Sequence, residues 1–416
     1  SFEGLNNAGT SRESNLLVIL NDNNMAIDRA TGALKSYLVK ITSSHHYNRL
    51  KQRAWAVLSH VPCLLRFLQK AGTATKQVLL HNSNLFESLN FRYFGTVDGH
   101  DIEELIRTLR ALKDIGGPKL LHIKTTKGKG YAPAENRPDL FHGVSGFDIE
   151  SGEIKAGKES FSDSFGKLIC KKAEENESIV AITAAMPGGT GLLELMKRYP
   201  ERLFDVGIAE EHAISMAGGL AKQGMTPVVA LYSTFLQRSY DQIMQDVAMQ
   251  KLHVIFAVDR AGLVGEDGET HHGVFDTGFL RQTPGLTVLA PATTAELRQM
   301  LRWAVYDQNG PVAIRYPRGG DRVAVEAAWN GSDTAVCHHT GKDVAIVPYG
   351  TMLENVLDAA NQLESDGIST GVFRLLRLSG LNEEELRQKL SGYRHVIVVE
   401  ETCAGSGLGD ALCALL

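Results

Sequence analysis

Cysteine is scarce in this sequence, and the cysteines that occur are not spaced for a metal site. There are five in 416 residues, an odd number, with no Cys-x-x-Cys pair. Scattered free thiols are typical of a reducing compartment, which predicts a cytoplasmic protein. The sequence also has no run of about 18 apolar residues and no signal-peptide pattern, so we expect neither a membrane span nor export.

The sequence has no long block of positive charge either. The formal net charge is −5, close to neutral for a chain of this length. A short basic group at 124–129 follows an expected strand, where a phosphate or turn role suits it better than a nucleic-acid groove. We therefore expect no nucleic acid and no membrane as partners.

What the sequence does contain is a series of short apolar runs separated by amphipathic stretches. Most runs are continuous rather than alternating, which is typical of parallel strands covered on both faces. Helix patterns lie between them, as at 102–115 and 294–307, where Thr294 is expected to be the N-cap. This alternation predicts α/β domains with mainly parallel sheets. The expected strands are 16–20, 120–125, 179–183, 227–231, 254–258, 287–290, 312–316, 344–348 and 396–399.

The order of these patterns divides the chain into three blocks. The blocks are 1–150, 160–320 and 343–416, with expected connections at 150–160 and 321–342. The first block has few strands for its length and an irregular segment at 41–85, whereas the middle block carries most of the strands. Because the sequence starts within one helical pattern and ends within another, we expect a fragment whose first and third domains are incomplete.

Two motifs of the first block place polar side chains directly after expected strands. The tripeptide 21–23, Asn-Asp-Asn, supplies amide and carboxylate oxygens that suit Mg²⁺ and a phosphate, although a plain turn is the commoner fate of such a sequence. The segment 127–131, Lys-Gly-Lys-Gly-Tyr, combines glycines that admit a ligand with lysines that favour an anion. A solvated loop is the alternative there.

Two motifs of the middle block follow apolar strands and lead into helices. The segment 205–212, Asp-Val-Gly-Ile-Ala-Glu-Glu-His, places a carboxylate at a helix start, where it is equally a capping charge or a catalytic acid. In the segment 232–242, the simplest interpretation makes Phe235 a core residue and makes Arg238 and Asp241 a surface pair three residues apart.

A third motif is the long glycine-rich loop 259–273, which contains Arg260, Asp267, His271 and His272. Two adjacent histidines cannot both face one metal from a strand. The loop therefore favours contact with a polar substrate over a metal site.

The fourth motif, 315–319, is Arg-Tyr-Pro-Arg-Gly and also follows an expected strand. Its arginines suit bidentate recognition of a phosphate, and the alternative is surface solvation. Since the carboxyl ends of parallel strands share one edge of a sheet, one crevice would hold all four motifs of the middle block.

Taken in order, the motifs resemble those of the 1-deoxy-D-xylulose-5-phosphate synthases, thiamine diphosphate enzymes of transketolase-like type. The strings that carry the resemblance are NDNNM, TVDGHD, TTKGKGYAPAE, FHGVSGFD, AEEH, YSTFLQRSYDQ, DRAGLVGEDGETHHG and RYPRG. The resemblance covers nearly the whole chain and is most specific between 90 and 319. It implies three doubly wound α/β domains: the first binds the cofactor diphosphate, the second binds its aminopyrimidine, and the third helps to form a homodimer.

The resemblance also implies roles for individual residues. Asn23 is similar to the Mg²⁺ ligand and Tyr131 to a residue of the cofactor site. Glu210 resembles the catalytic glutamate that hydrogen-bonds the pyrimidine ring nitrogen, and Phe235 the aromatic side chain near that ring. The pocket for the acceptor sugar phosphate is implied to contain Tyr232, Arg260, Asp267, His271, Arg318, His142 and Arg238. Of these, His271 is also implied to move a proton or bind a hydroxyl.

The activity implied by the resemblance joins pyruvate to glyceraldehyde 3-phosphate, with loss of carbon dioxide, to give 1-deoxy-D-xylulose 5-phosphate. This is the first step of the non-mevalonate route to isoprenoid precursors. A transketolase or a 2-oxoacid dehydrogenase component is the alternative within the same cofactor class. A paralogue without activity is a third interpretation, because the family's Gly-Asp-Gly segment does not occur in this sequence. We expect that segment upstream of the first residue. Glu211 and His272 both stand where the family usually has glutamine.

Overall fold

The computed structural model describes residues 2–25, 85–144, 146–154, 157–327 and 329–416. These residues fall into two units, of which the first ends at Phe141 and the second begins at His142. The irregular segment expected at 41–85 lies outside the described residues, apart from Leu85. Each unit is built of mainly parallel strands and helices, so the predicted α/β fold is confirmed.

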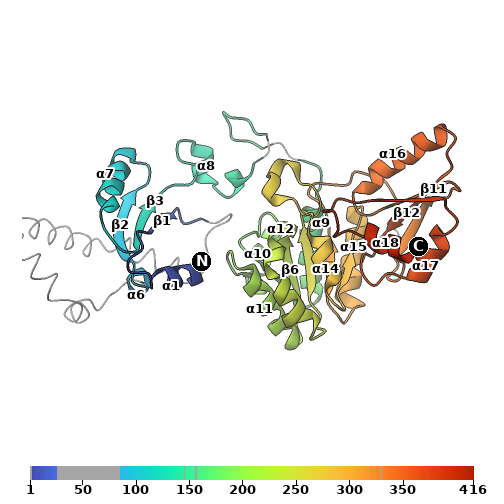
Figure 1. Ribbon diagram of the computed structural model, residues 1–416, viewed down its shortest axis with the longest axis horizontal. Coiled ribbons are helices and arrows are strands. Elements are labelled where there is room, and N and C mark those ends of the chain that lie inside the picture. The colour runs from blue at the N-terminus through green and yellow to red at the C-terminus, as the bar shows by residue number, and fades with distance from the viewer. Residues whose placement is uncertain (1, 26–84, 145, 155–156, 328) are drawn as a thin grey trace, which may run out of the picture. The chain divides into compact units, whose positions relative to one another are not determined.

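The first unit contains a three-stranded parallel sheet in the order β1-β3-β2 (Figure 1). Its small core is formed by Phe86, Phe91, Tyr93 and Leu120. Strand β2 was not predicted, because its polar and glycine-containing residues lie at an edge of this sheet. The elements are α1 (Phe2–Ala8), β1 (Leu17–Asp22), α6 (Leu85–Ser88), β2 (Arg92–Asp98), α7 (Ile102–Lys113), β3 (Lys119–Lys124) and α8 (Ala132–Asn136).

The second unit is built around a six-stranded parallel sheet in the order β5-β4-β6-β7-β9-β8. Every residue of β4, β7 and β9 is buried, which is the reason these strands read as continuous apolar runs. The strands are β4 (Ile179–Thr183), β5 (Leu203–Asp205), β6 (Thr226–Tyr232), β7 (Ile255–Asp259), β8 (Thr287–Leu289) and β9 (Val312–Arg315).

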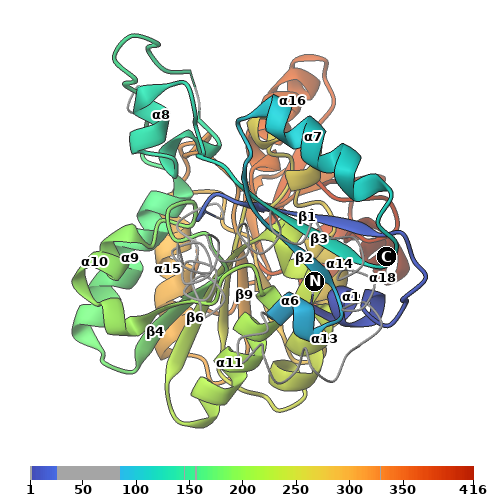
Figure 2. The ribbon, with the colours of Figure 1, turned by 90° about the vertical axis from the view of Figure 1, so that its left-hand side faces the viewer.

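Helices cover both faces of this sheet. Apolar side chains of α9, α10 and α15 form one buried layer, and those of α11, α14 and the π-helical turn η4 form another. The helices around this sheet can be followed in Figure 2. The helices are α9 (Phe161–Glu175), α10 (Leu193–Arg198), α11 (Glu210–Lys222), α12 (Ser233–Leu236), α13 (Tyr240–Gln242), η4 (Ile243–Ala248), α14 (Asp276–Gln282) and α15 (Thr294–Tyr306). The capping box of Ser160 and Asp163 fixes the start of α9.

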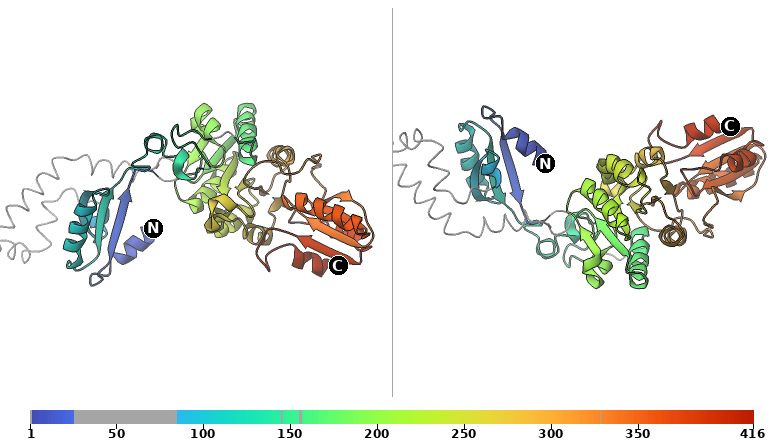
Figure 3. Two further views of the ribbon diagram at one scale, coloured as in Figure 1. Left: turned by 90° about the horizontal axis from the view of Figure 1, so that it is seen from above. Right: turned by 90° about the horizontal axis from the view of Figure 1, so that it is seen from below.

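The same unit continues into a four-stranded sheet in the order β10-β12-β11-β13, where β10 is antiparallel to β12. This part of the chain is drawn in orange to red, near the C-terminus, in Figure 3. The elements are β10 (Ala335–His339), β11 (Val344–Pro348), α16 (Met352–Ser365), β12 (Thr370–Leu375), α17 (Glu383–Leu390), β13 (His395–Val399) and α18 (Gly409–Leu415). The stretch 321–342, expected as a connection, therefore contains a strand. That expectation is wrong for 335–339, because β10 alternates buried and exposed residues at a sheet edge.

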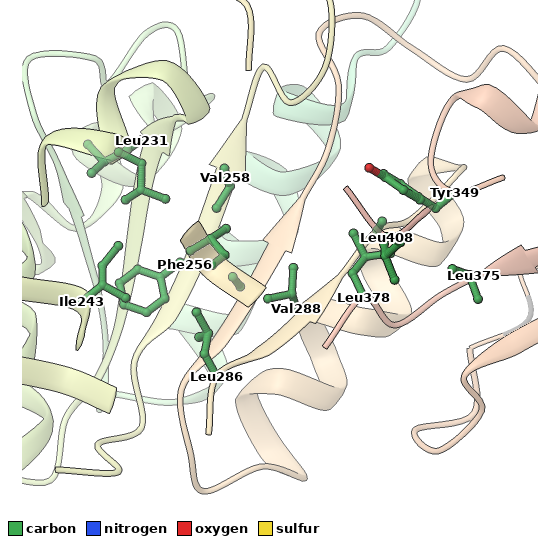
Figure 4. Close-up of a cluster of buried hydrophobic side chains, with 14 of the residues drawn as sticks. Leu231, Ile243, Phe256, Val258, Leu286, Val288, Tyr349, Leu375, Leu378 and Leu408 are labelled. Carbon is green, nitrogen blue, oxygen red and sulfur yellow. The ribbon is translucent and has the colours of Figure 1, made fainter. Parts of the chain in front are cut away.

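The two sheets of the second unit share one hydrophobic core. Phe256 and Val288 of the six-stranded sheet belong to the same buried cluster as Tyr349, Leu378 and Leu408 of the C-terminal part (Figure 4). The middle and C-terminal parts are thus packed as one body.

The N-cap of α15 differs from the expected one by a residue. Thr293, in extended conformation, accepts a hydrogen bond from the Glu296 amide at 3.2 Å, whereas Thr294 is already helical. The prediction of Thr294 is wrong because its hydroxyl is engaged in tertiary contact, donating to Asp321 at 3.0 Å.

Candidate active site

The candidate site of the second unit lies where the parallel strands end. Tyr232 is the last residue of β6, Asp259 is the last residue of β7, and Arg315 is the last residue of β9. Because these strands are neighbours in one parallel sheet, the segments that follow them meet at one edge.

Three of the predicted side chains form an aromatic row at this edge. The rings of Tyr232 and Phe235 stack with centroids 5.7 Å apart, and His271 meets Phe235 edge-on at 5.3 Å. The guanidinium of Arg260 lies 4.0 Å from the centroid of the Tyr232 ring. A cation held over an aromatic face in a largely buried place is a favourable contact.

Asp267 links the two arginines that the sequence motifs single out. Its Oδ2 atom lies 3.6 Å from Nε of Arg260 and 3.3 Å from Nε of Arg318. Arg260 Nε and Asp267 Oδ2 are both buried without a hydrogen-bond partner among the described residues. The contacts of Asp267 with the two arginines are therefore ion pairs longer than a hydrogen bond of ordinary length.

A cleft of about 610 Å³ opens beside these arginines. Arg260, Arg318 and Arg322 contribute positive charge to it, and Ser162 contributes a hydroxyl. Guanidinium groups bind phosphate through paired hydrogen bonds, so the cleft can hold a phosphorylated ligand.

Arg260 is held by residues that sequence reasoning missed. Its backbone is in the left-handed region, with φ at +58°. The buried Asp259 carboxylate accepts from the Arg260 amide at 2.7 Å and from Ser162 Oγ at 2.7 Å, and it lies 3.0 Å from Arg260 Nη1. Burial raises the pKa of Asp259, and Arg260 opposes that rise. An aspartate at the end of an apolar strand, next to an arginine, is the sequence signal that could have found it.

Gly189 also holds Arg260 in place, because its carbonyl accepts a hydrogen bond from Arg260 Nη1 at 2.6 Å. A Cβ atom at this position would lie 1.8 Å from the Tyr232 hydroxyl oxygen. The close approach of the loop to Tyr232 and Arg260 therefore requires glycine here.

Glu210 begins α11 and is almost completely buried, with 3% of its side chain exposed. Arg238 contacts its carboxylate through Nη1 and that of Glu211 through Nη2, at 3.0 Å for Glu211. Burial raises the pKa of Glu210, while Arg238 opposes the rise. A capping charge needs no burial, so the burial of Glu210, which favours its protonated form, is not explained by capping alone.

Arg238 does not form the surface pair with Asp241 that the simplest interpretation suggested. Asp241 instead accepts a hydrogen bond from Gln245 Nε2 at 2.8 Å. That interpretation is wrong because the Arg238 side chain reaches α11, which lies far away in sequence.

The first unit carries Asn23 and Tyr131. Of the tripeptide 21–23, Asn21 and Asp22 end strand β1, and Asn23 follows it directly. Asn23 Oδ1 accepts from the Met25 amide at 3.0 Å, which closes a turn over 23–25. Its neighbour Asp22 lies 3.2 Å from the buried His122, whose other ring nitrogen meets the Tyr93 hydroxyl at 2.6 Å. Burial lowers the pKa of His122.

Oxygen atoms of this turn suit a hard cation, although the described residues contain no group of three or more His, Cys, Asp or Glu side chains placed to hold a metal ion. Tyr131 precedes α8 and packs edge-on against Phe141 at 5.7 Å. His142 ends the 3₁₀ turn at Leu140–His142, where the second unit begins.

In the described part of the chain, no helix is long and apolar enough to cross a membrane.

The family model described as "1-deoxy-D-xylulose-5-phosphate synthase" matches residues 1–125. The models "Transketolase, pyrimidine binding domain" and "Transketolase, C-terminal domain" match 158–321 and 333–416. The matched segments together span most of the chain.

Among solved structures, a split gene transketolase described as an inactive beta4 tetramer is 29% identical, with a TM-score of 0.56, and covers 63% of this chain and 85% of its own. A transketolase from Campylobacter jejuni is 16% identical, with a TM-score of 0.53, and covers 100% of this chain and 73% of its own. The second likeness concerns the fold alone.

Among relatives, 1-deoxy-D-xylulose-5-phosphate synthase of Chlorobaculum tepidum is 45% identical over 99% of this chain and 66% of its own length. That of Bacteroides fragilis is 43% identical over 100% of this chain and 66% of its own. That of Caldanaerobacter subterraneus is 44% identical over 100% of this chain and 68% of its own. The chain thus spans about two thirds of the length of these relatives. At this identity and coverage, the chain belongs to the 1-deoxy-D-xylulose-5-phosphate synthase family.

Proposed function

We propose that this chain carries out, or is part of the protein that carries out, the condensation of pyruvate with glyceraldehyde 3-phosphate. Carbon dioxide leaves, and 1-deoxy-D-xylulose 5-phosphate is the product. The observation that carries the proposal is the continuous contact from His271 through Phe235 and Tyr232 to Arg260 and the neighbouring Asp267. Family membership supports the same reaction.

The cofactor of this reaction is thiamine diphosphate, which when bound acts as the electron sink for decarboxylation and carbon–carbon bond formation. Glu210 suits the pyrimidine part of it, because a buried carboxyl with a raised pKa can share a proton with a ring nitrogen. Phe235 is proposed to supply an apolar face to the same ring. In the first unit, taken by itself, Asn23 suits the Mg²⁺ that accompanies a diphosphate, and Tyr131 is proposed as a second residue that binds the cofactor.

The arginines are proposed to hold the acceptor. Arg260 and Arg318 bind the phosphate of glyceraldehyde 3-phosphate, and Asp267 keeps the two guanidinium groups oriented before the phosphate arrives. His271 holds or moves a proton at the substrate hydroxyl or carbonyl oxygen. His142, Tyr232 and Arg238 complete the pocket.

A homodimer in the cytoplasm is proposed as the working state. The split gene transketolase that shares the fold is described as a tetramer, which supports self-association of this type of chain. Scattered cysteines, all of them free where the structure describes them, support a reducing compartment.

Identification of the product tests the proposal. The chain, and the full open reading frame that encodes it, would be incubated with pyruvate, glyceraldehyde 3-phosphate, thiamine diphosphate and Mg²⁺. Formation of 1-deoxy-D-xylulose 5-phosphate, detected by mass spectrometry and NMR, is the expected result. Exchange of two-carbon units between sugar phosphates would indicate a transketolase, and acyl transfer to a lipoyl group a dehydrogenase component. Absence of turnover by the full reading frame would indicate an inactive paralogue.

Arg318→Ala is expected to raise the KM for glyceraldehyde 3-phosphate by roughly 10- to 100-fold, because a charge-assisted phosphate contact is lost. The KM for pyruvate should stay nearly constant, as measured by steady-state kinetics with each substrate varied in turn. Arg302→Ala, on the exposed side of α15, is the matched control. An equal rise for both substrates would show that Arg318 does not hold the phosphate.

Asn23→Ala is expected to weaken Mg²⁺-dependent binding of thiamine diphosphate by at least about tenfold, since one oxygen ligand is removed. Quenching of intrinsic fluorescence during cofactor titration measures this affinity. Asn23→Asp keeps an oxygen ligand and the acceptor for the Met25 amide, so it should bind more tightly than the alanine variant. If Asn23→Ala binds thiamine diphosphate with unchanged affinity, Asn23 does not bind Mg²⁺ and serves only to form the turn.

A further inference from the structure

The side chain of Arg238 joins two adjacent carboxylates of different exposure. Its Nη1 atom contacts Glu210, of which 3% is exposed, and its Nη2 atom donates to Glu211 Oε1 at 3.0 Å, where 40% of the side chain is exposed. Arg238 itself is 46% exposed. One guanidinium therefore reaches from solvent to a buried acid and is anchored by a second acid at the surface.

Few other charged groups face Glu210. Helix α11 packs against β4, β6, α13 and η4, as well as the turn that carries Arg238. Asp241 of α13 accepts from Gln245, and Asp246 of η4 accepts from Ser215 at 2.5 Å. Strands β4 and β6 contribute Tyr232 as their one titratable side chain. Among the residues that the structure describes, Arg238 and Glu211 are thus the charged groups that act on Glu210.

The two groups act in opposite directions. Burial raises the pKa of Glu210, Arg238 opposes that rise, and the negative charge of Glu211 adds to it. A guanidinium has donors on both terminal nitrogens and can satisfy two carboxylates at once. While Glu211 binds Nη2 of Arg238, the guanidinium interacts with two carboxylates and binds each less tightly than it would bind one alone.

We propose that Glu211 is a positioning residue. It binds Nη2 of Arg238, so that the Glu210 carboxyl can leave Nη1 and share its proton with a ring nitrogen of the bound ligand. The inference rests on the role proposed above for Glu210. An amide at position 211 would leave Arg238 with Glu210 as its single anionic partner, and that buried pair would tighten.

The test is a titration of the Glu210 carboxyl in the chain without cofactor. Infrared spectra of protein labelled with ¹³C-glutamate are recorded against pH, and the spectrum of the Glu210→Gln variant is subtracted to isolate this group. In Glu211→Gln the midpoint of the Glu210 titration is expected to move to lower pH, since a like charge is removed and Arg238 turns fully to Glu210. Glu211→Ala should shift it in the same direction, and Arg238→Gln in the opposite one.

Glu383→Gln is the matched control, because Glu383 is an exposed glutamate in the first turn of α17 in the C-terminal part. It should leave the Glu210 midpoint in place. The inference is overturned if Glu211→Gln leaves the midpoint unchanged or raises it, or if Glu383→Gln shifts it equally. The titration needs neither cofactor nor substrate, so its outcome and that of the product assay are independent.

Discussion

Glu210→Gln is expected to lower kcat by about 10²–10⁴-fold, the range typical of losing a positioned acid–base group. Glutamine has the same shape and can still hydrogen-bond, so binding of thiamine diphosphate should weaken far less than kcat. Steady-state kinetics on the active protein, with a separate cofactor titration, measure both quantities. Glu194→Gln, an exposed glutamate in the first turn of α10, controls for loss of charge. Near-normal turnover in Glu210→Gln would show that Glu210 is not a catalytic residue.

The same substitution has an expected effect on stability. Because burial raises the pKa of Glu210 in the folded state above its ordinary value of 4.5, folding favours the protonated form. The wild-type protein therefore loses stability as the pH rises from that value through the folded-state pKa. Glu210→Gln lacks this loss, so near neutral pH it should unfold at an equal or higher temperature than the wild type. A lower melting temperature throughout would show that the Arg238 contact outweighs the cost of burial.

Arg374→Met is expected to destabilise the second unit by about 3–5 kcal/mol, because the buried Glu296 carboxylate loses the positive charge that compensates its own. Arg374 and Glu296 are both completely buried, and two hydrogen bonds of 2.7 and 2.5 Å join them. The pair connects α15 of the middle part to β12 of the C-terminal part. Burial lowers the pKa of His338, whose neutral ring accepts a third hydrogen bond from Arg374 at 3.0 Å. Denaturant-induced unfolding followed by circular dichroism measures the loss.

A double variant separates charge from packing in this prediction. Glu296→Gln with Arg374→Met removes both charges and keeps an acceptor for the Ala292 amide, which Glu296 binds at 2.9 Å. The double variant should recover much of the stability lost in Arg374→Met. Lys167→Met breaks the exposed pair of Lys167 and Glu159 and should change stability little. If the double variant is as unstable as the single one, the loss comes from packing and not from the uncompensated charge of Glu296.

The predicted strands illustrate how far sequence patterns reach. Every expected strand has a counterpart in the structure. In β4, β7 and β9 the burial of both faces forces a continuous apolar run that local inspection detects. Strand β12 is fully buried and was nevertheless missed. Gly371 and Arg374 interrupt its apolar pattern, and Arg374 is compatible with burial only because Glu296, 78 residues earlier, lies opposite.

The sequence by itself determined the α/β fold, the parallel strands and the motifs at their carboxyl ends, since these depend on local composition and on the geometry common to parallel sheets. The tertiary structure decided which side chains meet. Arg238 pairs with Glu210 and Glu211 rather than with Asp241, and Asp259 with Gly189 holds Arg260. Those contacts depend on the order of strands in the sheet and on the path of the loops between them. Both are settled by packing between residues far apart in the chain, which no local pattern encodes.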